Sequence, residues 1–449
     1  MAATDQKNKP TSQRAPTVLT ALLAGLSCLL VLAGATAAVR ATQPDAQQPA
    51  AQQPAAQQPA TAQPAGAGTE GDKAAGTPAA AALSIKVQGK QLIDGSGHAV
   101  QLRGVNVSGL EFVPIQGWSP ANPWGGQTGD DTPNWSLIAS WKTNVVRLPL
   151  NQASWLGKPC VRPGPGQKKL NPDPGGNYRQ TVARSVQQAN AAGLYVILDL
   201  QWTAPANLCP EEMNSAPDMD NSPAFWVSVA TQFKDNPAVL FDLYNESWTF
   251  PREDWTAGGD AWAFWRDGGT LTQYAPGPHI YKYKAAGMQA LVDAVRSTGA
   301  TNVLVVGGMQ WASDLSGWVS HRPKDPLNQM AAAWHAYPKA PGSGGSDASV
   351  PTGGTEQYRH AEGILAAGVP VIIGEIGDHS APGTAGAPFL AQMLPWADAH
   401  NVSYLGWTWD PWGGTDNVLI KDAAGTPSDG FGQYFRQHLL CRAAANCKR

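Results

Sequence analysis

Two glutamates of this 449-residue chain stand at the ends of apolar runs that resemble buried strands. Glu246 follows Asn245 in FDLYNESW, residues 241–248, and Glu375 closes VPVIIGE, residues 369–375. Two facing carboxyl groups can cleave a glycosidic bond, because one attacks the anomeric carbon while the other protonates the departing oxygen. The negative charge of the first raises the proton affinity of the second, which separates the two roles. The pair predicts this chemistry if the fold brings both residues together.

Other polar and aromatic side chains also stand at strand ends. They are Arg147 at 143–150, Asp199 and Gln201 at 195–202, His335 and Tyr337 at 331–337, and Trp407 and Trp409 at 403–409. Each alone has an ordinary structural explanation, since a buried guanidinium can pair, a core imidazole can be hydrogen-bonded and an indole can simply pack. Their shared position at the ends of successive strands is what indicates a common site.

The elements that must position these residues alternate along the chain. A hairpin is expected at 90–102, where DGSG supplies the turn. Eight strands are expected at 101–107, 143–150, 195–202, 239–246, 302–308, 331–337, 369–375 and 403–409. Helical periodicity follows several of them, clearest at 178–193 and 288–300. This alternation predicts an α/β fold, a (β/α)8 TIM barrel with an N-terminal hairpin, in which all carboxyl ends of the strands open onto one face. The long connection at 247–280 is expected to form part of a cleft wall.

Roles can be assigned to the side chains around the two glutamates. Arg147 would keep the attacking carboxylate ionised, and Asn245 would hold the 2-hydroxyl of the sugar, a contact that strengthens in the transition state. His335 and Tyr337 would orient the carboxyl pair. A tryptophan would form the floor of the sugar site. Five loop tryptophans are candidates either for further stacking platforms or for seals of the barrel top: Trp118, Trp124, Trp155, Trp248 and Trp311.

The ordered motifs of the chain resemble those of glycoside hydrolase family 5. They are LRGVN at 102–106, VRLP at 146–149, YNE at 244–246, HAY at 335–337, GE at 374–375 and SYLGW at 403–407. The resemblance covers about residues 84 to 440. That family consists of retaining barrel enzymes that include cellulases and β-mannanases.

The resemblance implies that Glu246 is the acid/base and Glu375 the nucleophile. It further implies a cleavage subsite lined by Arg147, Asn245, His335, Tyr337 and Trp407. One position departs from the family, which usually has Asp-Leu-His at the end of its third strand, whereas this chain has Asp199, Leu200 and Gln201. A glutamine can donate a hydrogen bond to a sugar hydroxyl but carries no charge, so Gln201 bears on substrate preference rather than on the reaction.

Two segments precede the barrel. Residues 1–41 read as a signal peptide or a signal anchor, because basic residues come before 23 uncharged residues at 17–39. Residues 42–82 are expected to form an Ala/Gln/Pro-rich disordered linker, and residues 83–449 are expected to form the catalytic barrel. Both cleavage of the segment and membrane anchoring through 17–39 remain open. The chain is therefore expected to be exported, and either secreted or tethered to the outer face of the cytoplasmic membrane.

The cysteine spacing and the net charge limit which ligands and binding partners are expected. Four cysteines follow the linker, and the simplest pairing in an exported chain is Cys160 with Cys209 and Cys441 with Cys447. No pair has the short spacing of a zinc site. The formal charge of −3 argues against a nucleic-acid partner. We expect a monomer that acts on a polysaccharide or oligosaccharide without a metal or organic cofactor.

The predicted activity is hydrolysis of a β-linked polysaccharide by double displacement, with endo-β-1,4-glucanase activity preferred. The alternatives are a β-mannanase or another β-glucanase of the same family, and a non-catalytic glycan-binding barrel at the cell surface. The retaining mechanism predicts a separation of ~5.5 Å between the two carboxyl groups.

Overall fold

The computed structural model describes residues 83–117, 122–125, 132–162, 166, 168–248, 259–274, 280–338, 351, 354–378, 387–411 and 417–444. The predicted signal or anchor segment and the linker lie outside the described residues, as do Trp118 and Cys447. Across the described ranges, no helix has both the length and the apolar character that crossing a bilayer requires.

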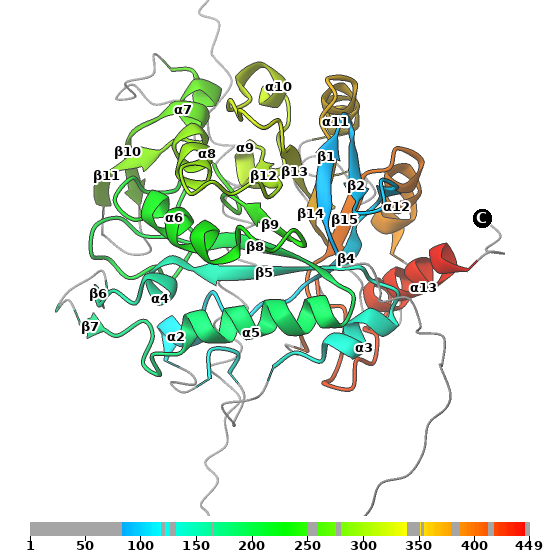
Figure 1. Ribbon diagram of the computed structural model, residues 1–449, viewed down its shortest axis with the longest axis horizontal. Coiled ribbons are helices and arrows are strands. Elements are labelled where there is room, and N and C mark those ends of the chain that lie inside the picture. Colours follow the sequence, from blue (N-terminus) through cyan, green and yellow to red (C-terminus); the bar gives the residue numbers. More distant parts are fainter. Residues whose placement is uncertain are drawn as a thin grey trace, which may run out of the picture. The chain divides into compact units, whose positions relative to one another are not determined.

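A closed barrel of eight parallel strands forms the centre of the described structure (Figure 1). In chain order the strands are β4 (Arg103–Asn106), β5 (Val145–Asn151), β8 (Tyr195–Trp202), β9 (Val239–Asp242), β12 (Leu304–Gly307), β13 (Met330–Ala336), β14 (Val371–Ile376) and β15 (Ser403–Gly406). All eight predicted strands are present, and β15 pairs with β4 to close the barrel. The predicted TIM barrel is confirmed.

Helices surround the strands. They are α2 (Val113–Gln116), α3 (Trp135–Ser140), α4 (Gln152–Leu156), α5 (Tyr178–Ala191), α6 (Ser222–Phe233), α7 (Ala261–Asp267), α8 (Met288–Arg296), α9 (Met309–Ala312), α10 (Trp318–His321), α11 (Glu356–Ala366), α12 (Pro388–Ala399) and α13 (Phe431–Ala443). The apolar residues of α5 recur at helical spacing and are buried, and the helix ends before Gly193, whose positive φ of 82° suits glycine. In Figure 1, α5 runs alongside β5 and β8, as its periodicity requires.

The N-terminal hairpin covers one end of the barrel. Strands β1 (Ile85–Gln88), β2 (Gln91–Asp94) and β3 (Ala99–Val100) form an antiparallel sheet with the predicted turn between β2 and β3. Ile85 and Leu92 belong to one apolar cluster with inward side chains of the barrel strands, among them Ile197 and Leu240. The hairpin thus closes the end opposite the predicted site.

The long connection after β9 contains elements that the sequence did not reveal. Helix α7 is followed by an antiparallel pair, β10 (Gly268–Tyr274) and β11 (Ile280–Ala286), while 249–258 and 275–279 lie outside the described residues. The Ala286 amide donates to the Pro217 carbonyl at 2.8 Å, which joins this hairpin to the loop after β8.

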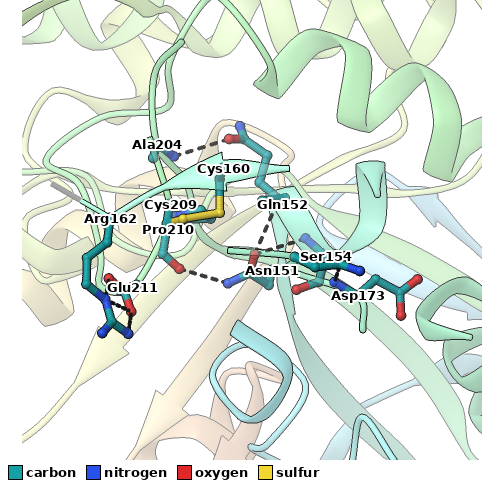
Figure 2. Close-up of a disulfide and its surroundings, with 12 residues drawn as sticks. Asn151, Gln152, Ser154, Cys160, Arg162, Asp173, Ala204, Cys209, Pro210 and Glu211 are labelled. Atoms are coloured by element: carbon teal, nitrogen blue, oxygen red, sulfur yellow. Dashed lines mark hydrogen bonds and ion pairs between the residues drawn. A yellow bond between two sulfur atoms is a disulfide. The ribbon is translucent and has the colours of Figure 1, made fainter. Parts of the chain in front are cut away.

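A disulfide joins two loops at the carboxyl ends of β5 and β8 (Figure 2). Cys160, in the short strand β6 (Cys160–Val161) that pairs with β7 (Lys169–Leu170), bonds to Cys209. Beside it, Asn151 Nδ2 donates to the Pro210 carbonyl at 2.9 Å. The first predicted pairing is confirmed, whereas the second involves Cys447, which lies outside the described residues.

Candidate active site

The barrel brings the predicted residues to one end, although some lie beyond the strands themselves. Strand β9 stops at Asp242, so Asn245 and Glu246 stand on the loop that follows it. Glu375, by contrast, lies inside β14, one residue before its end. Trp407 likewise falls just after β15 rather than within it. The strand ends at 246 and 409 were therefore placed too late.

The two glutamates face each other. Together with His335, Glu246 and Glu375 each place one side-chain atom so that all three atoms lie within 4.8 Å of one another. The side chain of Glu246 is 11% exposed and that of Glu375 is 5% exposed, so both retain some access to solvent. This spacing favours a retaining pair, whose carboxyl groups lie ~5–5.5 Å apart, over an inverting pair, whose carboxyl groups lie ~6.5–9.5 Å apart.

Arg147 links Glu375, the candidate nucleophile, to buried polar side chains inside the barrel. Its guanidinium, which is fully buried, donates to Glu375 Oε1 and Asp242 Oδ2, both at 2.9 Å, and to Asn245 Oδ1 at 2.8 Å. It also lies 3.1 Å from Asp199 Oδ1. One cation thus neutralises part of the charge of three carboxyl groups, which fixes Glu375 and Asn245 in space.

The inner members of this network were only partly foreseen. Asp199 was recognised at its strand end, but Asp242 was not singled out, and neither was Asn106, which accepts from Arg147 Nη1 at 3.1 Å. A carboxylate in the middle of the apolar run VLFDL was the available signal for Asp242. Burial raises the pKa of Asp242 to about 6, against the opposing effect of Arg147.

Glu246 is set up to hold a proton. Burial raises the pKa of its carboxyl to about 8, while the charge of Arg147 acts in the opposite direction. The cause differs from the expectation, because removal from water rather than the negative charge of Glu375 is responsible. Glu246 Oε1 lies 2.9 Å from His335 Nδ1. Burial lowers the pKa of His335 to about 4, so the imidazole is neutral at pH 7. A neutral imidazole places no positive charge beside Glu246 that would favour loss of its proton.

Glu375 is held from two sides. Tyr337 donates its hydroxyl to Glu375 Oε2 at 2.7 Å, and Arg147 donates to Oε1. Burial raises the pKa of the Tyr337 phenol well above its usual value, so this hydroxyl stays a donor at neutral pH. The two contacts hold the Glu375 carboxyl group in a fixed orientation close to Glu246.

The same three side chains could in principle ligate a metal ion, since two carboxylates and an imidazole are suitable donors. However, Glu375 is already paired with the cation of Arg147, and a dication at this point would repel that guanidinium. The donor set fits proton transfer and nucleophilic attack better.

The tryptophans divide into two groups. Trp155 is fully buried against Phe225, and Trp124 packs on Trp135 with its Nε1 donating to Ser185 at 2.9 Å, so neither is a stacking platform. Trp248 and Trp311 are half-buried and stack on each other with ring centroids 5.5 Å apart. Trp407 is half-buried beside the mouth of the barrel.

A second pair of acidic residues near this face was not predicted. Glu111 accepts from the Ser108 hydroxyl and from the Gly109 amide, the latter at 2.8 Å, and burial raises its pKa to about 7. Asp410 Oδ2 accepts from the Ser108 amide at 3.2 Å. The sequence signal for this acidic pair was the presence of polar residues, Ser108 and Glu111, directly after the first predicted barrel strand. Their contacts fix the loop after β4.

Comparison with known proteins now identifies the family. The family model "Cellulase (glycosyl hydrolase family 5)" matches residues 93–413. The chain belongs to glycosyl hydrolase family 5. The predicted family is confirmed.

Curated relatives of this family 5 chain are distant. It is 22% identical over 365 residues to Endoglucanase 5 of Pectobacterium carotovorum subsp. carotovorum, which covers 81% of this chain and 56% of the relative. It is also 22% identical over 352 residues to a mannan endo-1,4-beta-mannosidase of Streptomyces lividans, covering 76% of this chain and 70% of the relative. The chain thus spans little more than half the length of the first relative.

Solved structures share the fold of the family 5 chain. A beta-glucanase from Saccharophagus degradans aligns with a TM-score of 0.54 at 23% identity, covering 81% of this chain and 94% of that one. A beta-mannanase from Streptomyces thermolilacinus aligns with a TM-score of 0.51 at 20% identity, covering 81% and 98%. At these identities the likeness establishes the barrel and leaves the sugar undecided.

Proposed function

We propose that this chain is an endo-β-1,4-glucanase that works by double displacement, with Glu246 as acid/base and Glu375 as nucleophile. The proposal rests on the facing pair of carboxyl groups, because the side chains that contact Glu375 differ in chemical type from the side chain that contacts Glu246. Glu375 lies against a guanidinium and a phenol donor, whereas Glu246 is buried beside a neutral imidazole. One group is therefore stabilised as an anion and the other as an acid.

The reaction follows from these contacts. Glu375 attacks the anomeric carbon while Glu246 gives its proton to the departing glycosidic oxygen, which leaves a glycosyl ester on Glu375. Glu246 then takes a proton from water, and that water releases the sugar with its original anomeric configuration. Arg147 and Tyr337 hold Glu375 in place through both steps, and Trp407 forms the floor under the sugar.

Glucan is preferred as the substrate because several relatives are named endoglucanases and because the beta-glucanase from Saccharophagus degradans has also been solved with cellotetraose. Mannan is the second candidate, favoured by the mannosidase of Streptomyces lividans and the mannanase of Streptomyces thermolilacinus. The release of reducing ends from a panel of β-glucans and β-mannans separates the two.

Covalent trapping tests the mechanism. A 2-deoxy-2-fluoro glycoside with a good leaving group should label Glu375 once per molecule, and mass spectrometry of the digested protein should locate the label. The control is the E375Q variant, which should remain unlabelled. Binding of oligosaccharides without labelling or turnover would instead support a non-catalytic glycan-binding barrel.

We further propose that the protein is exported as a monomer, and is then either secreted or anchored through residues 17–39. The Cys160–Cys209 disulfide supports export, because such bonds persist in oxidising compartments. N-terminal sequencing of the protein from culture medium and from membranes would separate cleavage from anchoring, and light scattering would give the mass in solution.

A further inference from the structure

Two buried aspartates contact the same cation from neighbouring strands. Asp199 of β8 and Asp242 of β9 are register partners in the parallel barrel, where adjacent strands run side by side (Figure 1). Asp199 Oδ1 lies 3.1 Å from Arg147 Nη2, and Asp242 Oδ2 lies 2.9 Å from Arg147 Nε. The two aspartates are 0% and 1% exposed, so both carboxyl groups are held against one guanidinium away from water.

The charges around this guanidinium do not balance if every carboxyl group is ionised. Arg147 supplies one positive charge, while Asp199, Asp242 and Glu375, which all contact it, would supply three negative charges. An uncompensated charge in the interior is so costly that a buried acid binds a proton instead. At least one of the three carboxyl groups is therefore expected to be neutral.

The hydrogen bonds indicate which carboxyl group carries the proton. Glu375 accepts from Arg147 Nη1 at 2.9 Å and from the Tyr337 hydroxyl at 2.7 Å. Asp242 Oδ2 accepts from Arg147 Nε at 2.9 Å, and bonds of this kind stabilise an ionised carboxylate. Neither oxygen of Asp199 makes a hydrogen bond to a described residue, although Oδ1 lies near the guanidinium, and Asp242 Oδ1 makes none either. A proton on Asp199 would turn one of these unpaired acceptors into a donor for another.

We propose that Asp199 and Asp242 share one proton at neutral pH and that Asp199, which carries it, is a positioning residue for Glu375. The Asp199 hydroxyl donates to Asp242 Oδ1, so the pair opposes Arg147 with one negative charge instead of two. Asp242 then stays in place as the acceptor for Arg147 Nε. An ionised Asp199 would instead compete for the guanidinium and oppose the ionised form of the nucleophile.

The surroundings of Asp199 favour the proton. Burial raises the pKa of its carboxyl well above the ordinary value, and three acidic neighbours act in the same direction: Asp242 on β9, Glu375 on β14 and Glu111 on the loop after β4. Arg147 on β5 acts in the opposite direction, but its N–H groups already donate to Asp242, Glu375 and other acceptors. The guanidinium therefore does not satisfy Asp199 as well.

A carbon-13 label on the side-chain carboxyl of aspartate tests the shared proton in the full-length protein. At pH 7 the wild type should show a protonated-carboxyl resonance that D199N lacks, because an amide cannot take up this proton. D242N keeps Asp199 but removes the neighbouring charge, so the same resonance should titrate at least ~1 pH unit lower. D218N is the matched control, since Asp218 is also buried but is bonded to Gln152 and Ser222, and it should leave the resonance unchanged.

The acid limb of kcat/KM gives a second readout, which rests on the proposed function. Because Asp199 is already neutral there, D199N should leave the midpoint of this limb where it is in the wild type. The double variant D199N/D242N also removes the remaining carboxylate, which leaves more of the Arg147 charge for Glu375. Its midpoint should therefore fall by ~1 pH unit.

Three results would overturn the proposal about the proton. They are a D199N spectrum that still contains the resonance, an acid limb that D199N shifts, and an unchanged titration in D242N, which holds whether or not D199N folds. Absence of turnover on every β-glucan and β-mannan would instead reject the proposed function. The spectra need no substrate, so they would still decide whether the two aspartates share a proton.

Discussion

The two ends of the barrel interior are built from the same strands but are filled with opposite chemistry. At the end covered by the hairpin, the inward side chains are apolar, including Val145, Ile197 and Leu240. Two residues further along the same strands stand Arg147, Asp199 and Asp242, which are equally buried. A step of two residues along these strands therefore leads from an apolar layer of the barrel interior to an ionic layer of charged side chains.

The difference shows where stability and chemistry are placed. The apolar layer gains free energy from removal of hydrocarbon from water. The ionic layer carries a cost, since burial raises the pKa of Asp199 and Asp242, and Asp242 Oδ1 has no hydrogen-bond partner among the described residues. Through Arg147, the ionic layer holds the Glu375 carboxyl group in a fixed orientation. Changes at the two ends should therefore affect different properties.

The largest effect is expected at Glu375 itself. E375Q removes the proposed nucleophile and keeps the shape of the side chain, so turnover should fall below detection on all β-glucans and β-mannans. The change also replaces one acceptor oxygen with an NH2 group and removes the ion pair with Arg147, so the melting temperature should fall while unfolding stays cooperative. Reducing-end assays and thermal unfolding measure the two properties, and survival of activity in E375Q would reject the assignment of roles.

Loss of Arg147 should affect both properties. R147M leaves three carboxyl groups without their cation, and breaking a buried ion pair typically costs ~3–5 kcal/mol of unfolding free energy. The loss should be smaller at pH 5 than at pH 7, because the buried carboxyls can then bind protons and lose their charge. Urea unfolding at both pH values tests this, and an equal loss at both would show that the charges are not responsible.

A change at the apolar end should affect stability alone. L240A removes hydrocarbon from a fully buried position and should cost ~2–5 kcal/mol of unfolding free energy. Because Leu240 is one layer below Asp242, kcat and the pH profile per folded molecule should stay as in the wild type. A shifted pH profile in L240A would mean that the two layers are not separable.

The smallest effect concerns the proton on Glu246. With a pKa of about 8, its acid form should be lost above that pH, and kcat/KM should then fall ~10-fold per pH unit for substrates with poor leaving groups. An aryl glycoside whose leaving group needs no proton should show a flatter alkaline limb. A common profile for both substrates would place the proton elsewhere.

Stability gives an independent check on the same group. The folded pKa of Glu246 lies above its ordinary value, so its contribution to stability is present at low pH and is lost as pH rises towards about 8. E246Q should therefore gain stability relative to the wild type above pH 8, and this difference should shrink below about pH 5. Thermal unfolding across this range measures it.

The sequence by itself determined the barrel, the hairpin and the residues of the carboxyl pair. Strand periodicity and turn residues are local properties, and the motifs around Glu246 and Glu375 are short and ordered. Even so, local patterns placed the ends of β9 and β15 too late and gave no sign of β10 and β11. Where a strand ends depends on where its pairing with neighbouring strands ends, and this pairing is not visible in the strand's own segment.

Only the tertiary structure decided what each side chain does at the site. Whether Trp155 forms a platform or core, and whether Asp242 joins Arg147, depends on neighbours that are remote along the chain. The high pKa of Glu246 likewise comes from burial by several loops rather than from its own segment. Burial and hydrogen-bond partners depend on how several segments pack together in the folded protein, so no single segment encodes them.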